Sequence, residues 1–279
     1  LIAFGVVNGI AFSQDFLSLY FFYELLTLST LPLVMHAMDE KAQYAGRKYL
    51  IYSISGAACA FIGIVFLLYY SSSLDFTYGG LSQDVTGDRA GTTLLAAFVC
   101  AFFGFGVKAA IFPFHGWLPD ASVAPTPVSA LLHAVAVVKA GAFAVARLIY
   151  YGFGAGFLRG THAQTIVMAA TIVTIVYGSA RALRTPHLKR RLAFSTVSNL
   201  SYILFSLTLM TSGGLTGALT HMVYHAVVKI TLFACAGAII VHSHREYVYE
   251  LEGMGSRMPV VFGTFTISSL ALIGLPPLG

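Results

Sequence analysis

LTGALTHMVYHAVVKITLFACAGAIIV, residues 215–241, is apolar along most of its length, and Lys229 is its only Asp, Glu, Lys or Arg residue. An α-helix needs about 20 such residues to cross the hydrocarbon core of a membrane. Seven more runs of this kind are found at residues 16–35, 48–70, 93–112, 128–151, 165–183, 192–210 and 260–275. Because lipid cannot satisfy backbone amides and the runs do not alternate as barrel strands do, we expect each to be an α-helix.

The composition supports this interpretation. Of the 279 residues, 57% are hydrophobic and only 10% are charged, whereas soluble domains carry about 25% charged residues. We therefore predict an all-α, polytopic transmembrane helical bundle with about eight full spans, a partial span at residues 1–12, and discontinuous helices. We expect one membrane domain, residues 1–279, which begins at Leu1 and stops at LPPLG as a fragment of a longer chain would.

Some classes of function receive no support. The net charge of +5 is not gathered into a basic patch with exposed aromatics, so nucleic-acid binding is not predicted. Cys59, Cys100 and Cys235 lie in apolar runs without metal-ligand spacing, which is typical of core residues. We predict no metal and no cofactor, and we find no catalytic motif.

The loop charges predict sidedness. Ten Lys and Arg residues fall in or beside loops 36–48, 181–191 and 242–258, against only Arg89 and Arg159 in the alternate loops. This asymmetry places the three basic loops in the cytoplasm and loop 71–91, with Asp75, Asp84 and Asp88, outside. We expect a multi-pass protein of the cell inner (cytoplasmic) membrane.

Ionisable residues inside the predicted spans are the strongest functional signal. Lys108, Lys139 and Lys229 lie deep in apolar sequence, and Glu24 is the one acid in the middle of a span. Each such group costs about 2.5–3.5 kcal/mol at the bilayer centre unless it is paired or hydrated. Structural cross-links between helices are the alternative explanation, but one acid cannot pair with three lysines. We therefore predict a buried polar axis that carries charge.

His221, His225 and Lys229 are spaced four residues apart. On an α-helix they fall within an arc of about 80° and rise in steps of about 6 Å. Histidine titrates near neutral pH, so this face predicts a proton relay bridged by water. The same histidine spacing occurs in zinc sites, but no third ligand is near in sequence. Histidines on facing helices also bind haem, although the cation of Lys229 one turn away disfavours it.

Residues 105–141, FGVKAAIFPFHGWLPDASVAPTPVSALLHAVAVVKAG, contain the predicted break. Lys108 lies near the end of a span that Pro113 interrupts, and further prolines predict an ordered, non-helical connection to the next span. Gly104 and Gly106 are expected to let neighbouring helices approach Lys108. His133 and Lys139 are six residues apart, about 120° around a regular helix, and so would link two different neighbours.

Glu24 is the only buried acid that could pair with Lys108. A paired lysine holds its proton, and a desolvated, unpaired lysine tends to release it. We therefore expect the pair to act as a switch, in which movement or screening of Glu24 releases the proton.

The sequence resembles the antiporter-like proton-channel family, which comprises large membrane subunits of respiratory complex I, membrane-bound hydrogenases and Mrp-type cation/proton antiporters. The resemblance covers nearly the whole chain, in the order of the family. It is carried by YELLTLSTLPL around Glu24, FPFHGWLPDASVAPTPVSALLHAVAVVKAG, LKRRLAFSTVSNLSYI, HMVYHAVVKITLFACAGAI and IGLPPLG. The form APTPVSALLHA is more similar to the Mrp and hydrogenase branches, and the D-type subunit of Mrp antiporters is the nearest.

The resemblance implies a role for each candidate residue. Glu24 matches the family's glutamate and Lys108 the lysine paired with it. His133 and Lys139 match the bridging positions after the broken helix, and His221, His225 and Lys229 match the central relay helix. The family continues beyond LPPLG, so the outer exit of the proton path is not assigned.

These features predict a proton-translocating subunit of a Mrp-type monovalent cation/proton antiporter complex. Its expected partners are other membrane subunits, the lipid bilayer, protons and sodium. The alternative within the family is a proton-pumping subunit of an NADH:quinone oxidoreductase (complex I) or a membrane-bound hydrogenase. Quinone, flavin or iron–sulfur chemistry would then belong to partner subunits. Two other classes stay open: a membrane scaffold without transport, and a solute carrier with a substrate-sized cavity.

Overall fold

The computed structural model describes residues 1–71, 73–80 and 88–276, with the side chain of Asp88 left out. Asp84 of the predicted outer loop and the last three residues of IGLPPLG lie outside this part of the chain. The described residues form helices joined by short connections. The long helices are α1 Ile2–Phe12, α2 Phe16–Val34, α3 Glu40–Tyr70, α4 Asp88–Gly106, α7 Val137–Arg147, α9 His162–Arg184, α10 Leu188–Thr208, α11 Ser212–Ser243 and α13 Pro259–Ile273.

Polar residues fix where several of these helices begin. The side chains of Asp15, Asp39, Thr161 and Thr211 each accept a hydrogen bond from a backbone N–H of the first turn of α2, α3, α9 and α11, respectively. Such caps satisfy amides that the helix itself leaves free. The apolar runs therefore start and stop at defined positions although their interiors are nearly uniform in composition.

Six helical segments are long and apolar enough to cross a membrane: α2, α3, Arg89–Gly106 of α4, the composite segment Thr126–Phe153, α9 and α11. α10 has 21 residues but is not among them, because basic residues near its start and several Ser, Thr and Asn side chains lower its mean hydropathy. α13, with 15 residues, and α1, with 11, are shorter. The all-α multi-spanning fold is confirmed, and the count of eight full spans stays a prediction.

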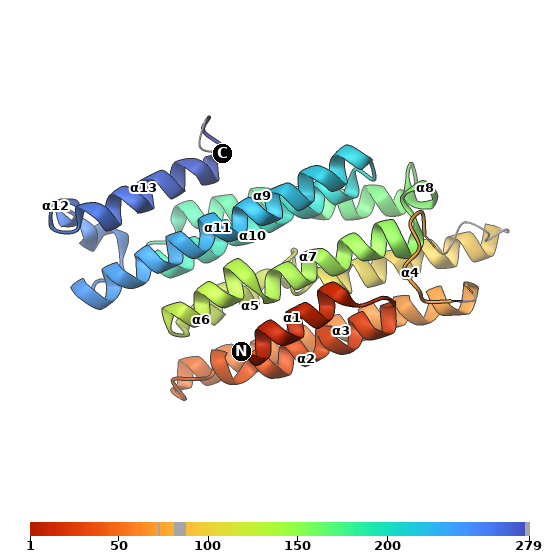
Figure 1. Ribbon diagram of the computed structural model, residues 1–279, viewed down its shortest axis with the longest axis horizontal. Helices are drawn as coiled ribbons and strands as arrows, with labels where there is room; N and C mark the ends of the chain where they lie inside the picture. Colours follow the sequence, from red (N-terminus) through yellow and green to blue (C-terminus); the bar gives the residue numbers. More distant parts are fainter. Residues whose placement is uncertain (72, 81–87, 277–279) are drawn as a thin grey trace.

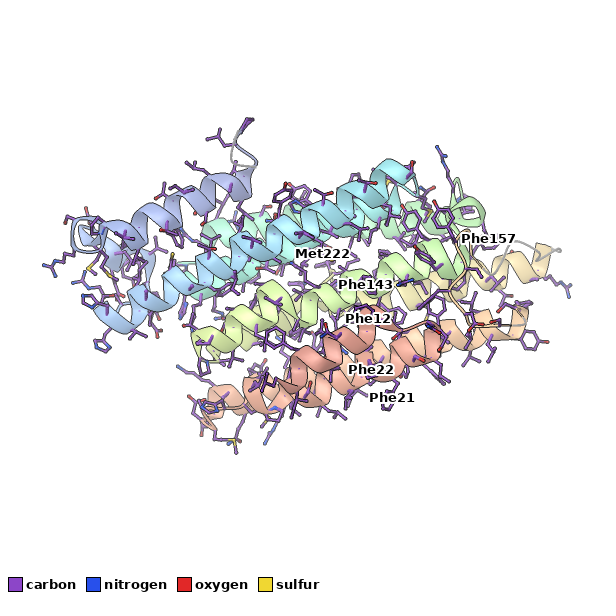
Figure 2. All side chains as sticks on the ribbon, viewed as in Figure 1. Phe12, Phe21, Phe22, Phe143, Phe157 and Met222 are labelled. Atoms are coloured by element: carbon purple, nitrogen blue, oxygen red, sulfur yellow. The ribbon has the colours of Figure 1, made fainter. Side chains whose placement is uncertain are left out.

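The composite segment runs through the middle of the bundle. Figure 1 shows α6, Thr126–Ala130, and α7 in green, with α1–α3 in red and orange on one side and α9, α10, α11 and α13, which run from green-cyan to blue, on the other. In its apolar stretch 78% of the residues are buried, against 22–44% in the other five spans. Exposed apolar side chains such as those of Phe12 and Phe21 lie on the surface of the bundle, where lipid would contact them (Figure 2).

Two expectations about the break were wrong. The predicted span 93–112 stops at Gly106, so Lys108 follows the helix, in a turn where Ala110 has φ 57°. The predicted non-helical connection is built of short helical turns instead: η1 Phe114–Gly116, α5 Trp117–Asp120 and η2 Ala121–Val123. Proline forbids a continuous helix but tolerates helical turns that begin next to it. The indole Nε1 of Trp117 donates to the carbonyl of Val107 at 2.8 Å, which ties this connection back to the end of α4.

The segment 128–151, predicted to be one regular helix, is irregular in the structure. α6 Thr126–Ala130 continues into a π-helical turn, η3 Leu131–Val135, and the backbone bends at Ala136 before α7 begins. A second π turn, η4 Leu148–Phe153, follows α7. The angle of about 120° expected between His133 and Lys139 assumed a regular α-helix, so it does not apply here.

The remaining elements close the two ends of the bundle: α8 Ala155–Leu158 lies at one end, and η5 Val248–Leu251 and α12 Met254–Arg257 at the other. At that other end the loop before α10 and the loop after α11 meet in a β-bridge between His187 and Tyr247. Asp120 binds Lys48 and Arg190 there, each at 2.6 Å. The three basic loops therefore gather at one end, as a membrane topology requires, while the side of the membrane stays a prediction.

Candidate functional site

Glu24 and Lys108 form the first part of the site. α2 presents Glu24, and the turn after α4 buries the side chain of Lys108 completely, with Nζ 3.6 Å from Glu24 Oε1. Nζ also donates to the carbonyl of Tyr23 and lies 3.4 Å from the centre of the Tyr23 ring, which favours a cation. The expected pairing is observed, whereas its role in transport stays a prediction.

Tyr23 was not predicted as part of this arrangement. Its hydroxyl donates to the carbonyl of Phe105 at 3.1 Å, and the two rings pack edge to face with centroids 5.1 Å apart. These contacts fix the tyrosine between α2 and the last turn of α4. Its carbonyl and its ring both contact the Lys108 ammonium. The apolar spacing of α2 gave no sign of this contact, although Tyr23 directly precedes Glu24.

Lys139 and His225 form the second part. Lys139 Nζ, on α7, contacts Nδ1 of His225, on α11, and both side chains are buried. No third polar group in the described structure bonds to the other ring nitrogen of His225. A lysine beside an imidazole nitrogen can transfer a proton only if one of the two partners is neutral, because two cations at this distance would repel each other. The pair therefore shares one proton more readily than it holds two.

His133 lies beside this pair but makes no hydrogen bond within the described residues. Its ring stacks on Phe233 of α11 with centroids 4.9 Å apart, and it is fully buried. Lys229, Lys139 and Lys189 are the lysines whose charges reach it. A proton on His133 would therefore lie among nearby cations, which repel it.

The predicted row of His221, His225 and Lys229 on α11, called the ladder below, is present, and its first and last members form hydrogen bonds with α10. His221 Nε2 lies 3.2 Å from Asn199 Oδ1, and its ring centroid is 6.1 Å from that of His225. Lys229 is fully buried, and its Nζ donates to the carbonyl of Leu192 at 2.9 Å and to Ser195 Oγ at 2.5 Å. Since neither acceptor carries a negative charge, nothing in these contacts obliges Lys229 to stay protonated.

α7 joins the two parts of the site. At Gly141 the helix lies so close to the Lys108 turn that a Cβ atom would be 2.6 Å from the backbone nitrogen of Ala109 and 3.0 Å from the carbonyl carbon of Lys108. Two residues earlier on the same helix, Lys139 reaches His225. Gly104 plays a similar part for α4, since its Cβ would be 2.6 Å from the carbonyl oxygen of Gly56 on α3. The expected close approach at Gly106 is instead to Ile111 of the following turn.

Sequence reasoning missed the residues of α10 that support the site. Ser195 and Asn199 are four residues apart, so one helical face could have been recognised, but Ser and Asn in apolar sequence gave a weaker signal than charge. Lys189 was assigned to a solvated loop; instead, only 8% of it is exposed and Nζ donates to the carbonyl of Ala124 at 3.0 Å. The composition of the loop gave no sign that Lys189, at the start of α10, would be buried.

Comparison with known proteins decides the family. The family described as "NADH:quinone oxidoreductase/Mrp antiporter, TM" matches residues 13–279. The chain belongs to this family. Glu24, Lys108 and the other candidate residues all lie within the matched range.

Two curated members of the NADH:quinone oxidoreductase/Mrp antiporter family illustrate the range of relatives. The A-type subunit of the Na(+)/H(+) antiporter of Alkalihalophilus pseudofirmus is 33% identical over 99% of this chain and 35% of its own length. The NAD(P)H-quinone oxidoreductase chain 4-2 of Synechocystis sp. is 31% identical over 99% of this chain and 48% of its own. The chain thus spans between a third and a half of these relatives. The nearer resemblance to the D-type Mrp subunit stays a prediction.

Solved structures of the family share the fold. A chain of the Mrp complex from Dietzia sp. superimposes with a TM-score of 0.88 and 25% identity, over 99% of this chain and 51% of that one. A chain of an archaeal respiratory complex, the membrane-bound sulfane sulfur reductase, gives 0.87 and 27%, over 99% and 55%. The bundle with its broken and composite helices is therefore a family architecture.

Proposed function

We propose that this chain conducts protons across the membrane through Glu24, Lys108, Lys139, His133, His225, His221 and Lys229, as a subunit of a Mrp-type monovalent cation/proton antiporter complex. The contact between Lys139 and His225 carries the proposal, because it connects the α7 side of the bundle to the ladder on α11. The relatives and the Mrp complex structure support the assignment to this class of protein.

The mechanism depends on exchange between charged and neutral side chains. While Glu24 stays 3.6 Å from Lys108, the lysine keeps its proton; when the carboxylate moves or is protonated, the buried ammonium loses its counter-charge and releases the proton. Water bridges the steps between Lys108, Lys139 and the ladder, where side chains alone leave buried polar atoms such as His133 Nδ1 and His225 Nε2 without a partner in the described residues. Lys139 and His225 then pass the proton between helices.

The setting of this relay is also a proposal. The chain would be one proton-conducting domain of a longer protein in the inner (cytoplasmic) membrane, with the basic loops in the cytoplasm and other membrane subunits around it. Sodium would be the exchanged ion. The clustering of the loops at one end of the bundle supports a single orientation.

A second candidate is a proton-pumping subunit of an NADH:quinone oxidoreductase or a related respiratory complex. The similarity to the Synechocystis oxidoreductase chain and to the archaeal sulfane sulfur reductase structure favours it. Vesicles containing the assembled complex would separate the two candidates. An antiporter moves protons in response to a sodium gradient, whereas a redox pump moves them only when its electron donor is supplied.

Lys229→Met in the full-length chain, assembled with its partners in membrane vesicles, tests the proposed function. Methionine keeps the length of the side chain but carries no proton, so we expect proton transport to fall about 100-fold, as for loss of a proton-transferring group. Arg184→Met, which changes an exposed basic residue outside the relay, is the control and should keep full activity. A scaffold without transport of its own would assemble with Lys229→Met and leave the activity of the complex intact.

A further inference from the structure

A polar pocket of about 640 Å³ opens at the end of the bundle where the basic loops meet. The start of α3, the α5–η2 connection, the start of α10 and the segment after α11 surround it. Its charged lining residues are Asp39, Glu40, Lys41, Asp120, Lys189, Arg190 and Glu246. Four of these are carboxylates, a composition that can collect protons from water and deliver them to a nearby acceptor. We call this cavity the polar pocket.

Lys189 connects the polar pocket to the interior. It is the one charged lining residue that is buried; the others are exposed or half-buried. Its ammonium donates to the carbonyl of Ala124, and no carboxylate of the described residues lies within ion-pair distance. A buried ammonium has three donors, so this lysine has bonding capacity beyond its one acceptor.

Two residues of the proposed relay, Lys229 and His133, lie near Lys189. Leu192, one turn further along α10, offers the carbonyl that accepts the hydrogen bond of Lys229. Leu188 and Leu192 pack in one small apolar cluster with Phe233, the residue on which His133 stacks. Lys189 is also near enough for its charge to act on His133. Lys189 therefore lies one turn of α10 from the carbonyl that binds Lys229, and its charge acts on His133.

We propose that the polar pocket is the opening through which protons pass between the relay and the aqueous phase on the side of the basic loops, and that Lys189 transfers them between the pocket and His133 or Lys229. This inference rests on the proposed function. It adds to it a defined opening and a relay residue on α10. The competing explanation is that Lys189 only anchors α10 to the connection at Ala124.

Two substitutions of Lys189 separate transfer from anchoring. Lys189→Gln keeps an N–H donor for Ala124 but has no transferable proton near neutral pH, whereas Lys189→Met removes both. If Lys189 transfers protons, both variants should slow proton transport about tenfold or more in vesicles of the full complex. If it is an anchor, Lys189→Gln should transport at the parental rate, which would overturn the proposal. Arg184→Met, at an exposed position near the same end of the bundle but outside the polar pocket, is the control.

A chemical block tests the opening without altering Lys189. Val123 lines the polar pocket and is 41% exposed, so Val123→Cys, in a variant whose three native cysteines are replaced by alanine, offers a thiol at the mouth. A charged, membrane-impermeant methanethiosulfonate reagent should stop transport when added on the side of the basic loops. Gly255→Cys on α12, at the same end of the bundle and where an added side chain meets open space, should be modified without loss. Full modification of the Val123→Cys variant with unchanged transport would overturn the proposal that the polar pocket is the opening.

The outcome for Lys229→Met shows which proposal has failed. If that variant transports normally, both the relay and the polar pocket as its opening are wrong. If it is inactive while Lys189→Gln and the modified Val123→Cys variant transport normally, the relay stands and only the opening proposed here is wrong.

Discussion

Glu24→Gln is the sharpest test of the Glu24–Lys108 switch, because it removes one charge and leaves the shape of the side chain. Lys108 keeps the Tyr23 carbonyl and the face of the Tyr23 ring, so only the carboxylate contribution is lost. Two unit charges 3.6 Å apart attract by about 5 kcal/mol at an effective dielectric constant of 20. Because 29% of the Glu24 side chain is exposed, solvent screening reduces the net effect to about 2 kcal/mol.

A difference of this size lowers the ratio of protonated to neutral Lys108 by about 30-fold. Proton transport should fall by up to that factor, measured as the initial rate of quenching of a pH-sensitive dye in vesicles with matched protein levels. Glu252→Gln, at an exposed position after η5, controls for loss of a carboxylate. Glu24→Gln combined with Lys108→Met should be no slower than Lys108→Met alone, since the two groups act as a unit. A Glu24→Gln rate within twofold of the parent would refute the switch.

Two further predictions concern stability. Gly141→Ala should lower the stability of the fold by about 1–3 kcal/mol and reduce the melting temperature of the purified complex, because its Cβ would overlap the backbone of the Lys108 turn. Gly156→Ala is the control, since its Cβ would meet open space. Equal melting temperatures for the two variants would contradict this packing. His187 lies between α9 and α10, where burial lowers its pKa below the ordinary 6.5 although Glu246, 3.1 Å away, acts to raise it. A folded-state pKa below the unfolded value means that stability is lost as pH falls through the region below 6.5, so the melting temperature should drop there, and His187→Gln should make the drop smaller. A drop of the same size in that variant would exclude His187 as a cause.

The long helices could be predicted because the membrane as solvent leaves few alternatives. The run at residues 16–35 is observed as Phe16–Val34, and the run at residues 215–241 as Ser212–Ser243. Lipid excludes unpaired backbone, so length and apolarity suffice to place such elements. The spacing of His221, His225 and Lys229 was informative for the same reason, since a helix fixes which face they share.

What escaped prediction depends on local geometry or on contacts between distant segments. Pro113 marked the break in the chain, but nothing in the sequence indicated that Lys108 would follow the end of α4 or that short helical turns would fill the connection. The contact of Lys139 with His225 joins residues 86 positions apart, through a bend that a regular helix would not have. Lys189 looked like a loop cation because sequence alone does not show which way a side chain at a helix start points.

The wide turn at residues 131–135 makes the effect of a change in chain length depend on where it falls. A π turn holds one residue more than an α-helical turn, so deleting one residue there would restore ordinary winding and leave the face of the following helix, with Lys139 and Gly141, where it is. Deleting one residue between His225 and Lys229, where α11 is regular, would instead rotate Lys229 by about 100° relative to the two histidines. Both shortened proteins would be almost as hydrophobic and would insert into the bilayer equally well. Only the second would lose conduction, although it keeps the same set of ionisable side chains.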